Sequence, residues 1–355
     1  MKFITGLCLA VLVSLSCAAV AQQQPSTPEQ AQQQRQTTQP GNNAPMWREV
    51  QRGDPNYTSI PGREMNVLIQ PPARFLGQDV RVTAGEAWRQ FRNGPVTFWG
   101  GWLVVLVVAL IAAFYFVFGS VKLHGAPTGR LIRRFSSVDQ IVHWTVAISF
   151  CILGLSGLIM LFGKHVLLPV FGYTLFAWLA ALSKNLHNFV APLFMVSVAV
   201  FAILFVRYNL PRAYDFVWFR NALGYVTGKK HVASGKFNGG EKVWFWLGVV
   251  GLSIVVSWSG VILLFPNFDQ TRAVMQDAWI WHAGAALLYI TMALGHIYLG
   301  TLGVEGAYQA MRTGYVDEVW AKEHHEIWYN DVKRGGAVAA SGAVPAGAPH
   351  MKEKS

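Results

Sequence analysis

Charged residues are scarce in this chain. Only 13% of its 355 residues are charged, whereas 53% are hydrophobic, and the mean hydropathy is +0.32. This composition argues against a soluble protein and indicates an integral membrane protein. The net charge of +11 could suggest a nucleic-acid partner. No recognisable nucleic-acid motif accompanies that charge, however, and basic loops of a membrane protein explain it.

Cysteine is also nearly absent, with only Cys8, Cys17 and Cys151. Residues 1–21 have a basic start, an apolar stretch and a terminal Ala-Val-Ala, and we interpret them as a secretory signal peptide. Cys17 leaves a lipoprotein as a less favoured alternative. Cleavage would leave Cys151 alone, which excludes an intramolecular disulfide and a cysteine-ligated iron–sulfur cluster. An electron carrier of this composition must hold its cofactor by other residues, and histidine is the candidate.

The segment that follows, residues 22–97, has no long hydrophobic run. Gln22–Pro45 is rich in Gln, Pro and Thr and almost without large apolar residues, so it cannot bury a core and is predicted to be disordered. Met46–Pro95 regains aromatic and apolar residues among Pro and Gly. We interpret it as an extended extracytoplasmic arm that packs on a partner.

Long apolar runs fill the rest of the chain, and five of them have the length needed to cross a hydrocarbon core. They are Phe98–Phe118, Ile141–Phe162, Leu186–Val206, Val243–Phe265 and Ala278–Leu302. We predict an all-α membrane protein, with a four-helix transmembrane bundle in residues 119–306, one additional N-terminal transmembrane helix at 98–118, and a cytoplasmic tail at 307–355. Val166–Leu182 is also apolar but contains Pro169 and Gly172, so we interpret it as an interfacial or re-entrant connection.

The distribution of basic residues supports this topology. The two loops predicted to be cytoplasmic, Gly119–Gln140 and Arg207–Lys242, carry eleven Lys or Arg, whereas Gly163–Asn185 and Pro266–Asp277 carry three. The asymmetry obeys the positive-inside rule with the mature N-terminus outside and the C-terminus in the cytoplasm. A sixth span at residues 166–182 would invert the later loops and lose this asymmetry.

The last apolar run carries His282 and His296. At about 100° per residue, a spacing of fourteen places them within roughly 40° of one helix face and about 21 Å apart along the axis. His143 enters the second span from the cytoplasm, at the depth of His296. His187 enters the third span from outside, at the depth of His282. An imidazole inside a membrane needs a partner, so these depths predict two pairs, His143 with His296 and His187 with His282.

Paired imidazoles from separate helices are typical axial ligands of a low-spin heme b. We therefore predict two hemes, a cytoplasmic-side one held by His143 and His296 and a periplasmic-side one held by His187 and His282. For any one histidine alone, a buried imidazole bonded to backbone or serine is the alternative. One zinc ion cannot use all four, because its ligands must converge within about 2 Å.

Two further features are open to more than one interpretation. Small residues on the same spans would let a flat porphyrin approach, although ordinary packing between membrane helices explains them equally well; they are Gly154, Gly157, Gly260, Gly284 and Gly295. His324 and His325 lie in a polar segment near the C-terminus. For these two we expect a surface or subunit-docking role rather than metal binding.

Several motifs occur in order between about residues 132 and 330: Val142-His-Trp144, Leu155-Ser-Gly157, Leu186-His187, Lys236-Phe-Asn-Gly-Gly-Glu-Lys242, the His282/His296 helix and Ala321-Lys-Glu-His-His325. In order and spacing they resemble the cytochrome b gamma subunit of respiratory formate dehydrogenase. Related cytochromes of hydrogenases share the four histidines. Met1–Phe118 departs from the shorter family members and is similar to a longer variant, in which segments like Gly62–Gln70 and Arg92–Val96 precede an added span.

The resemblance implies a subunit that passes electrons from formate oxidation through two b hemes to quinone and anchors the complex in the bacterial inner membrane. Its implied partners are an iron–sulfur beta subunit and a molybdenum- or tungsten-containing catalytic alpha subunit, since this chain has no site for formate. It also implies that Asn238 and Gly240 bind the quinone head beside His296, although an Asn-Gly-Gly sequence is also simply a turn. The alternatives are a cytochrome b of a hydrogenase or another molybdoenzyme, and a heme-free anchor or assembly protein.

Overall fold

A computed structural model describes residues 84–268 and 270–335 of the chain. The predicted signal peptide, most of the predicted arm and residues 336–355 of the predicted tail lie outside the described residues. Five helical segments in the described part are long and apolar enough to span a membrane, which confirms the predicted number. They are Ala87–Phe118, Ser137–Val166, Leu168–Tyr208, Gly239–Leu264 and Arg272–Gly303.

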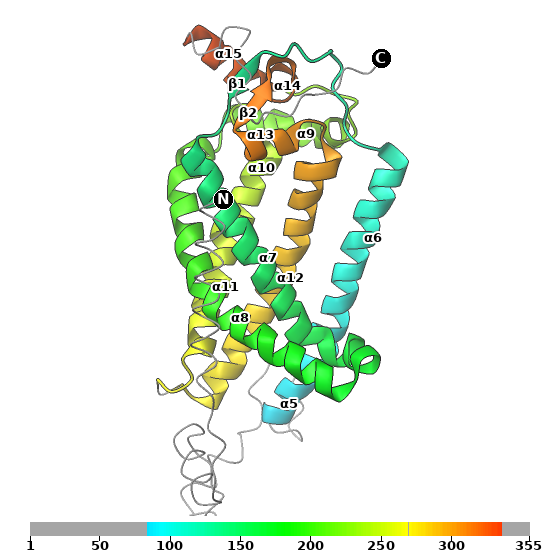
Figure 1. Cartoon of the computed structure of the whole chain (residues 1–355), viewed down its shortest axis with the longest axis vertical. Helices are drawn as coiled ribbons and strands as arrows, with labels where there is room; N and C mark the ends of the chain where they lie inside the picture. Colours follow the sequence, from blue (N-terminus) through cyan, green and yellow to red (C-terminus); the bar gives the residue numbers. More distant parts are fainter. Residues whose placement is uncertain (1–83, 269, 336–355) are drawn as a thin grey trace, which may run out of the picture. The chain divides into compact units, whose positions relative to one another are not determined.

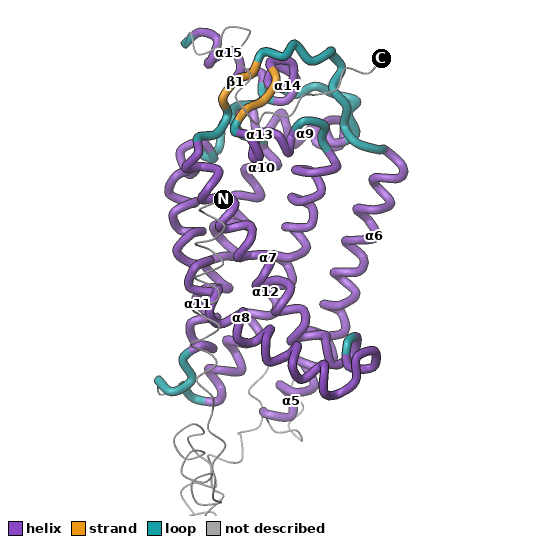
Figure 2. Tube along the Cα trace, in the orientation of Figure 1, coloured by secondary structure: helices purple, strands orange, loops and turns teal. Residues whose placement is uncertain are grey.

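Helices form nearly all of the described structure (Figures 1 and 2). In chain order the elements are α5 Ala84–Phe91, η1 Arg92–Trp99, α6 Gly100–Phe118, β1 Leu131–Arg133, α7 Ser137–Val166, α8 Leu168–Phe205, η2 Val206–Tyr208, α9 Ala213–Val226, α10 Gly239–Val243, η3 Trp244–Leu252, α11 Ser253–Leu264, α12 Arg272–Tyr298, η4 Leu299–Gly303, α13 Ala307–Thr313, β2 Tyr315–Asp317, α14 Glu318–His324 and α15 Glu326–Arg334. The all-α prediction is confirmed, with one small addition, the antiparallel pair of β1 and β2.

The second and third spans differ in how they begin. α7 begins at a capping box, in which Ser136 Oγ accepts from the Asp139 amide (3.2 Å) and the Asp139 carboxylate accepts from the Ser136 amide (2.8 Å). α8 begins at Leu168, well before the predicted third span, so the stretch interpreted as a connection is helical. It contains a kink at Gly172, whose φ of 71° and ψ of 175° are non-helical. Glycine adopts this conformation without the steric penalty that other residues meet.

The added N-terminal helix packs against the N-terminal half of α12. Gly100 is buried against Leu287, and a β-carbon at position 100 would lie 2.5 Å from the Leu287 Cδ1 atom. Closer to the N-terminus, the indole of Trp88 donates to the Gln276 carbonyl (3.2 Å). The guanidinium of Arg92 lies over both Trp88 and Trp279, 5.4 and 4.9 Å from their ring centroids. Residues 84–95 of the segment interpreted as an extended arm form helix instead, and Trp88 and Arg92 within it pack on α12.

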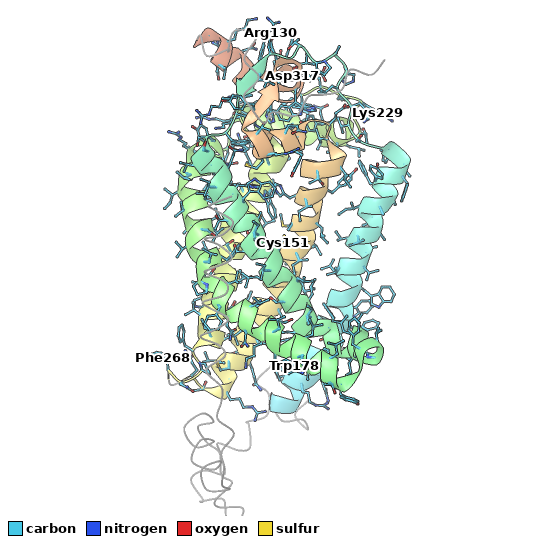
Figure 3. All side chains as sticks on the ribbon, viewed as in Figure 1. Arg130, Cys151, Trp178, Lys229, Phe268 and Asp317 are labelled. Carbon is cyan, nitrogen blue, oxygen red and sulfur yellow. The ribbon has the colours of Figure 1, made fainter. Side chains whose placement is uncertain are left out.

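The segments 119–136, 206–238 and 304–335 gather at one end of the bundle, and we call them the cap (Figure 1). Figure 3 shows Arg130, Lys229 and Asp317 at this end, with Trp178 and Phe268 at the other end. The cap shares one hydrophobic core with the bundle, and its contribution includes Ile132, Val316 and Trp320, all at most 3% exposed. Residues 307–335, predicted as a tail, therefore form a folded part of the cap.

Candidate functional site

The four histidines on the spans form the two predicted pairs. The ring centroids of His143 and His296 are 6.3 Å apart, and those of His187 and His282 are 6.0 Å apart. An imidazole nitrogen lies about 2 Å from a bound metal, so two rings on opposite sides of one metal ion have centroids about 6 Å apart. Both pairs therefore fit bis-imidazole coordination of a heme iron. The described residues contain no cluster of three or more His, Cys, Asp or Glu side chains that could hold a metal ion by itself.

The pair formed by His187 and His282 is oriented by hydrogen bonds at Nδ1. His282 Nδ1 lies 3.0 Å from the Val256 carbonyl and 3.2 Å from Ser259 Oγ. Because a carbonyl can only accept, the proton of neutral His282 is on Nδ1. His187 Nδ1 lies 3.0 Å from Ser156 Oγ. Metal-binding histidines commonly use one nitrogen in this way, which leaves Nε2 with a free lone pair for the metal.

The pair formed by His143 and His296 is held mainly by aromatic contacts. Trp244 stacks on His296 with centroids 4.9 Å apart and an interplanar angle of 12°. His143 lies 6.2 Å from the ring centroid of Phe201, and its Nδ1 is buried with no hydrogen-bond partner among the described residues. A buried polar atom without a partner is uncommon in proteins and calls for an explanation such as an unseen ligand.

Glycines line the faces of the spans next to these rings. A β-carbon at Gly260 would lie 3.2 Å from His282 Cε1, and one at Gly157 would lie 3.5 Å from His187 Cε1. Gly284 and Gly295, both on α12, have no atom within 4 Å of such a carbon. Gly154 differs, since it packs on Ile290. Four of the five predicted glycines therefore lie beside a histidine or beside open space.

An aromatic layer that was not predicted from the sequence separates the two pairs. Tyr289 packs on Phe150, Trp244 and Phe194, with ring centroids 4.6 to 6.4 Å apart, and its hydroxyl bonds Ser253 Oγ (2.9 Å). Tyr289 is seven residues from both His282 and His296, so the same helix face carries all three. This spacing in the sequence could have identified Tyr289 as part of the site.

The predicted quinone residues lie where the cap meets the fourth span. Asn238 is buried and is the N-cap of α10, with Oδ1 accepting from the Glu241 amide (3.0 Å), while Glu241 accepts from the Asn238 amide (2.8 Å). A β-carbon at Gly240 would lie 2.7 Å from Trp218. Both residues thus have structural roles in this turn. Trp244, which stacks on His296, follows Asn238 by six residues, or about 9 Å of helix.

Two buried cations hold this turn to the rest of the cap. Arg134 donates to the Lys236 carbonyl (2.8 Å) and to Glu241 (3.3 Å), and its guanidinium lies 4.9 Å from the Trp320 ring. Burial lowers the pKa of Arg134 despite the charge of Glu241. Lys242 contacts both carboxylate oxygens of Asp215 at 2.7 and 2.9 Å, and each side chain of that pair is only 6% exposed.

A surface or subunit-docking role was predicted for His324 and His325, and their burial shows that the surface alternative is wrong. They are 5% and 2% exposed. His325 Nδ1 lies 2.8 Å from the Gly235 carbonyl, and His324 Nδ1 lies 3.3 Å from the Tyr225 hydroxyl. The segment is polar in sequence, but Trp320 packs on both imidazoles and covers them.

Burial of His324 predicts a cap that loosens in acid. Burial, with a contribution from Arg134, lowers the pKa of His324 from 6.5 to about 4, although Glu323 acts in the opposite direction. Between these values the unfolded histidine binds a proton that the folded one does not, so the free energy of unfolding falls as pH drops from 6.5 to 4, by up to roughly 3 kcal/mol. The protection factors of the α14 amides, which correct for the slower intrinsic exchange in acid, should fall over this range. His324→Phe should weaken the pH dependence, and an unchanged dependence would contradict this explanation.

Comparisons with known proteins identify the family of the chain. Residues 134–314 match the family described as prokaryotic cytochrome b561. The chain is 30% identical over 213 residues to the cytochrome b556(Fdn) subunit of nitrate-inducible formate dehydrogenase from Escherichia coli K12, covering 59% of this chain and 94% of the relative. It is 33% identical over 209 residues to the cytochrome b556(fdo) subunit of the same strain, and 27% identical over 211 residues to the formate dehydrogenase cytochrome b556 subunit of Haemophilus influenzae. These cover 57% and 56% of this chain, and 94% and 83% of the relatives.

Proposed function

The chain belongs to the prokaryotic cytochrome b561 family, and from this membership we propose that it is the membrane electron-transfer subunit of a formate dehydrogenase complex. The relatives that it matches over most of their length are cytochrome b556 subunits of formate dehydrogenases. Its five apolar helices make it a multi-pass integral membrane protein.

The two histidine pairs are the observation that carries this proposal. Their centroid separations of 6.3 and 6.0 Å suit one heme b each, held by His143 with His296 and by His187 with His282. Each heme, when bound, supplies one-electron redox chemistry at its iron. Because α12 contributes one ligand to each pair, the two sites lie near opposite ends of one helix.

The other residues of the site orient the ligands and exclude lipid and water. The Val256 carbonyl and Ser259 keep the His282 proton on Nδ1, so that Nε2 is available as a ligand. Trp244 fixes the ring plane of His296. Tyr289 and its aromatic neighbours fill the space between the sites with apolar rings.

We assign the quinone head to the turn that contains Asn238 and Gly240, at the cap end of the bundle. Trp244 connects the turn to His296 by stacking on its ring. The turn lies where the cap meets the membrane-spanning bundle, so both a lipid-soluble quinone and water could reach it. The basic residues of the cap favour a cytoplasmic location for this end under the positive-inside rule, and the site of His187 and His282 would then face the periplasm of a bacterial inner membrane. The donor would then be an iron–sulfur beta subunit that serves a molybdenum- or tungsten-containing catalytic subunit outside.

Heme content tests the proposal directly. Pyridine hemochrome analysis of the purified chain should give about two b hemes per polypeptide, since each pair supplies the two axial ligands of one iron. One heme would leave a pair unused, and none would favour a heme-free anchor.

Co-purification should recover a formate-oxidising catalytic subunit, and recovery of a hydrogenase large subunit instead would reassign the donor.

A further inference from the structure

The helix α9, which belongs to the cap and not to the spans, has an exposed apolar face. Phe216 and Leu223 are 71% and 74% exposed, and Phe219 is also exposed. Seven residues separate Phe216 from Leu223, so these two side chains lie on the same side of the helix, with Phe219 beside them. Large apolar side chains gathered on one exposed face mark a surface that lipid or another protein covers.

The opposite side of α9 fixes the helix beside the start of the fourth span. Asp215 on that side binds Lys242 at 2.7 and 2.9 Å. Lys242 precedes Trp246 by four residues, or roughly 6 Å of helix. Trp246 is exposed on the span and donates its indole N–H to the Asn209 carbonyl (2.8 Å), in the link that leads to α9. The bonds of Asp215 and Asn209 therefore set the depth of α9 relative to Trp246.

This depth is that of the lipid headgroups. Tryptophans at the ends of spans commonly lie at the boundary between hydrocarbon and headgroups, as we infer for Trp246. The headgroup layer on each side of a bilayer is about 5–7 Å thick, so a helix held roughly 6 Å beyond Trp246 lies within it. α9 crosses the end of the bundle instead of continuing a span (Figure 1). Helices that lie in the membrane plane have this orientation.

Basic residues surround the apolar face. Within residues 206–230 the basic residues are all exposed, and they are Arg207, Arg212, Arg220, Lys229 and Lys230. Asp215 is the one acidic residue of this stretch, and its charge is compensated by the buried Lys242. Long basic side chains can lay their apolar stems along a hydrophobic surface while their charged ends reach phosphate groups. The surface therefore complements anionic headgroups above acyl chains.

We propose that α9 is an interfacial helix whose exposed face is immersed in anionic phospholipid of the leaflet on the cap side. This face continues the lipid-facing surface of the third span, because only residues 209–212 separate that span from α9. Leu210 in this link is exposed as well. Contact with lipid would hold α9, and through Asp215 and Lys242 the start of the fourth span, at a constant depth. The inference is independent of the heme and quinone roles proposed above.

Spin labelling of the full-length chain in liposomes of phosphatidylcholine and phosphatidylglycerol tests the immersion. The background has serine in place of the three cysteines, Cys8, Cys17 and Cys151. Nitroxides attached to Phe216→Cys and Leu223→Cys should collide more often with O2, which concentrates in the bilayer, than with a water-soluble nickel chelate. More frequent collisions with the nickel chelate would place the face in water. Protection from both reagents would show that a protein covers it, and either result would overturn the proposal.

Two reference positions calibrate these measurements. Ile203→Cys reports lipid contact, because Ile203 is exposed on the third span. Asp331→Cys reports water, because Asp331 is exposed on α15 in the cap. The labels on α9 should rank with the label at position 203 and not with the label at position 331.

The preference for anionic headgroups has its own test. The wild-type chain should immobilise spin-labelled phosphatidylglycerol in preference to spin-labelled phosphatidylcholine. Arg220→Gln combined with Lys229→Gln should lower this preference, by up to about fivefold for each charge removed. Lys333→Gln combined with Arg334→Gln removes two exposed charges from α15 and is the matched control. An unchanged preference in the α9 variant, or an equal loss in the control, would overturn the assignment to anionic lipid.

Discussion

Replacing His187 with alanine is expected to halve the heme content, from about two b hemes per chain to about one, and His143→Ala should do the same at the other site. Each change leaves a single imidazole where two had faced each other at 6.0 or 6.3 Å. Low-spin bis-imidazole coordination needs both ligands, so the affected heme should be lost or become high-spin. Pyridine hemochrome titration and the reduced α-band of purified protein measure the result. The double variant should retain almost no low-spin heme.

His165→Ala provides the control for these variants. His165 is on α7, like His143, but it is exposed near the opposite end of the helix. Its replacement should leave both hemes in place. If either His187→Ala or His143→Ala kept two intact low-spin hemes, the pairs would be structural rather than heme ligands. The histidines would then stabilise the bundle by Nδ1 hydrogen bonds such as that between His187 and Ser156.

Asp215→Asn is expected to cost about 3–5 kcal/mol of cap stability, the largest effect outside the histidine pairs. Lys242 and Asp215 are each 6% exposed and bonded at 2.7 and 2.9 Å, so removing the carboxylate charge leaves a buried ammonium without compensation. Asparagine can still accept from the Arg212 amide, which preserves the cap of α9. Thermal unfolding followed by hydrogen exchange of the α9 amides should show the lower midpoint.

The exposed pair of Asp331 and Arg334 is the matched comparison. Its atoms are 2.8 Å apart, but its side chains are 62% and 76% exposed, and such pairs contribute at most about 1 kcal/mol. Asp331→Asn should therefore leave the midpoint nearly unchanged. The double variant Asp215→Asn with Lys242→Met should recover much of the loss, since no buried charge remains. Equal midpoints for Asp215→Asn and Asp331→Asn would contradict the importance of burial.

The number of spans was predictable because segments that cross the hydrocarbon core are apolar, and hydropathy measures this property directly. The ends of the helices were not. Residues before Leu186 are helical apart from a kink at Gly172, whose non-helical φ and ψ separate two helical stretches, a feature that apolar content does not reveal. Residues 84–97 form helix because Arg92 and Trp88 pack on α12, a contact between segments nearly two hundred residues apart in the sequence. The resemblance to formate dehydrogenase cytochromes is confirmed by the comparisons.

The histidine pairs were predictable because topology assigns a depth to every residue of a span, and equal depth on neighbouring helices brings side chains together. Their role as heme ligands stays a prediction. The burial of His324 and of Lys242 could not be foreseen, since it depends on folding of the cap over a turn far away in sequence. Polar segments outside the membrane are usually exposed to solvent. In the cap, polar side chains are instead buried by specific partners, above all Trp320, Tyr225 and Asp215.

The position of α12 in the chain has a consequence for biogenesis. It is the last of the five spans, and it supplies one histidine to each pair. During synthesis the first four spans can enter the membrane while His143 and His187 are still unpaired. Both pairs are then completed by the arrival of a single helix, so a polypeptide truncated before residue 282 would contain neither. Under the proposed heme role of the pairs, stable cofactor capture would be deferred until the membrane domain has been translated to its end, and incomplete products would be left without heme.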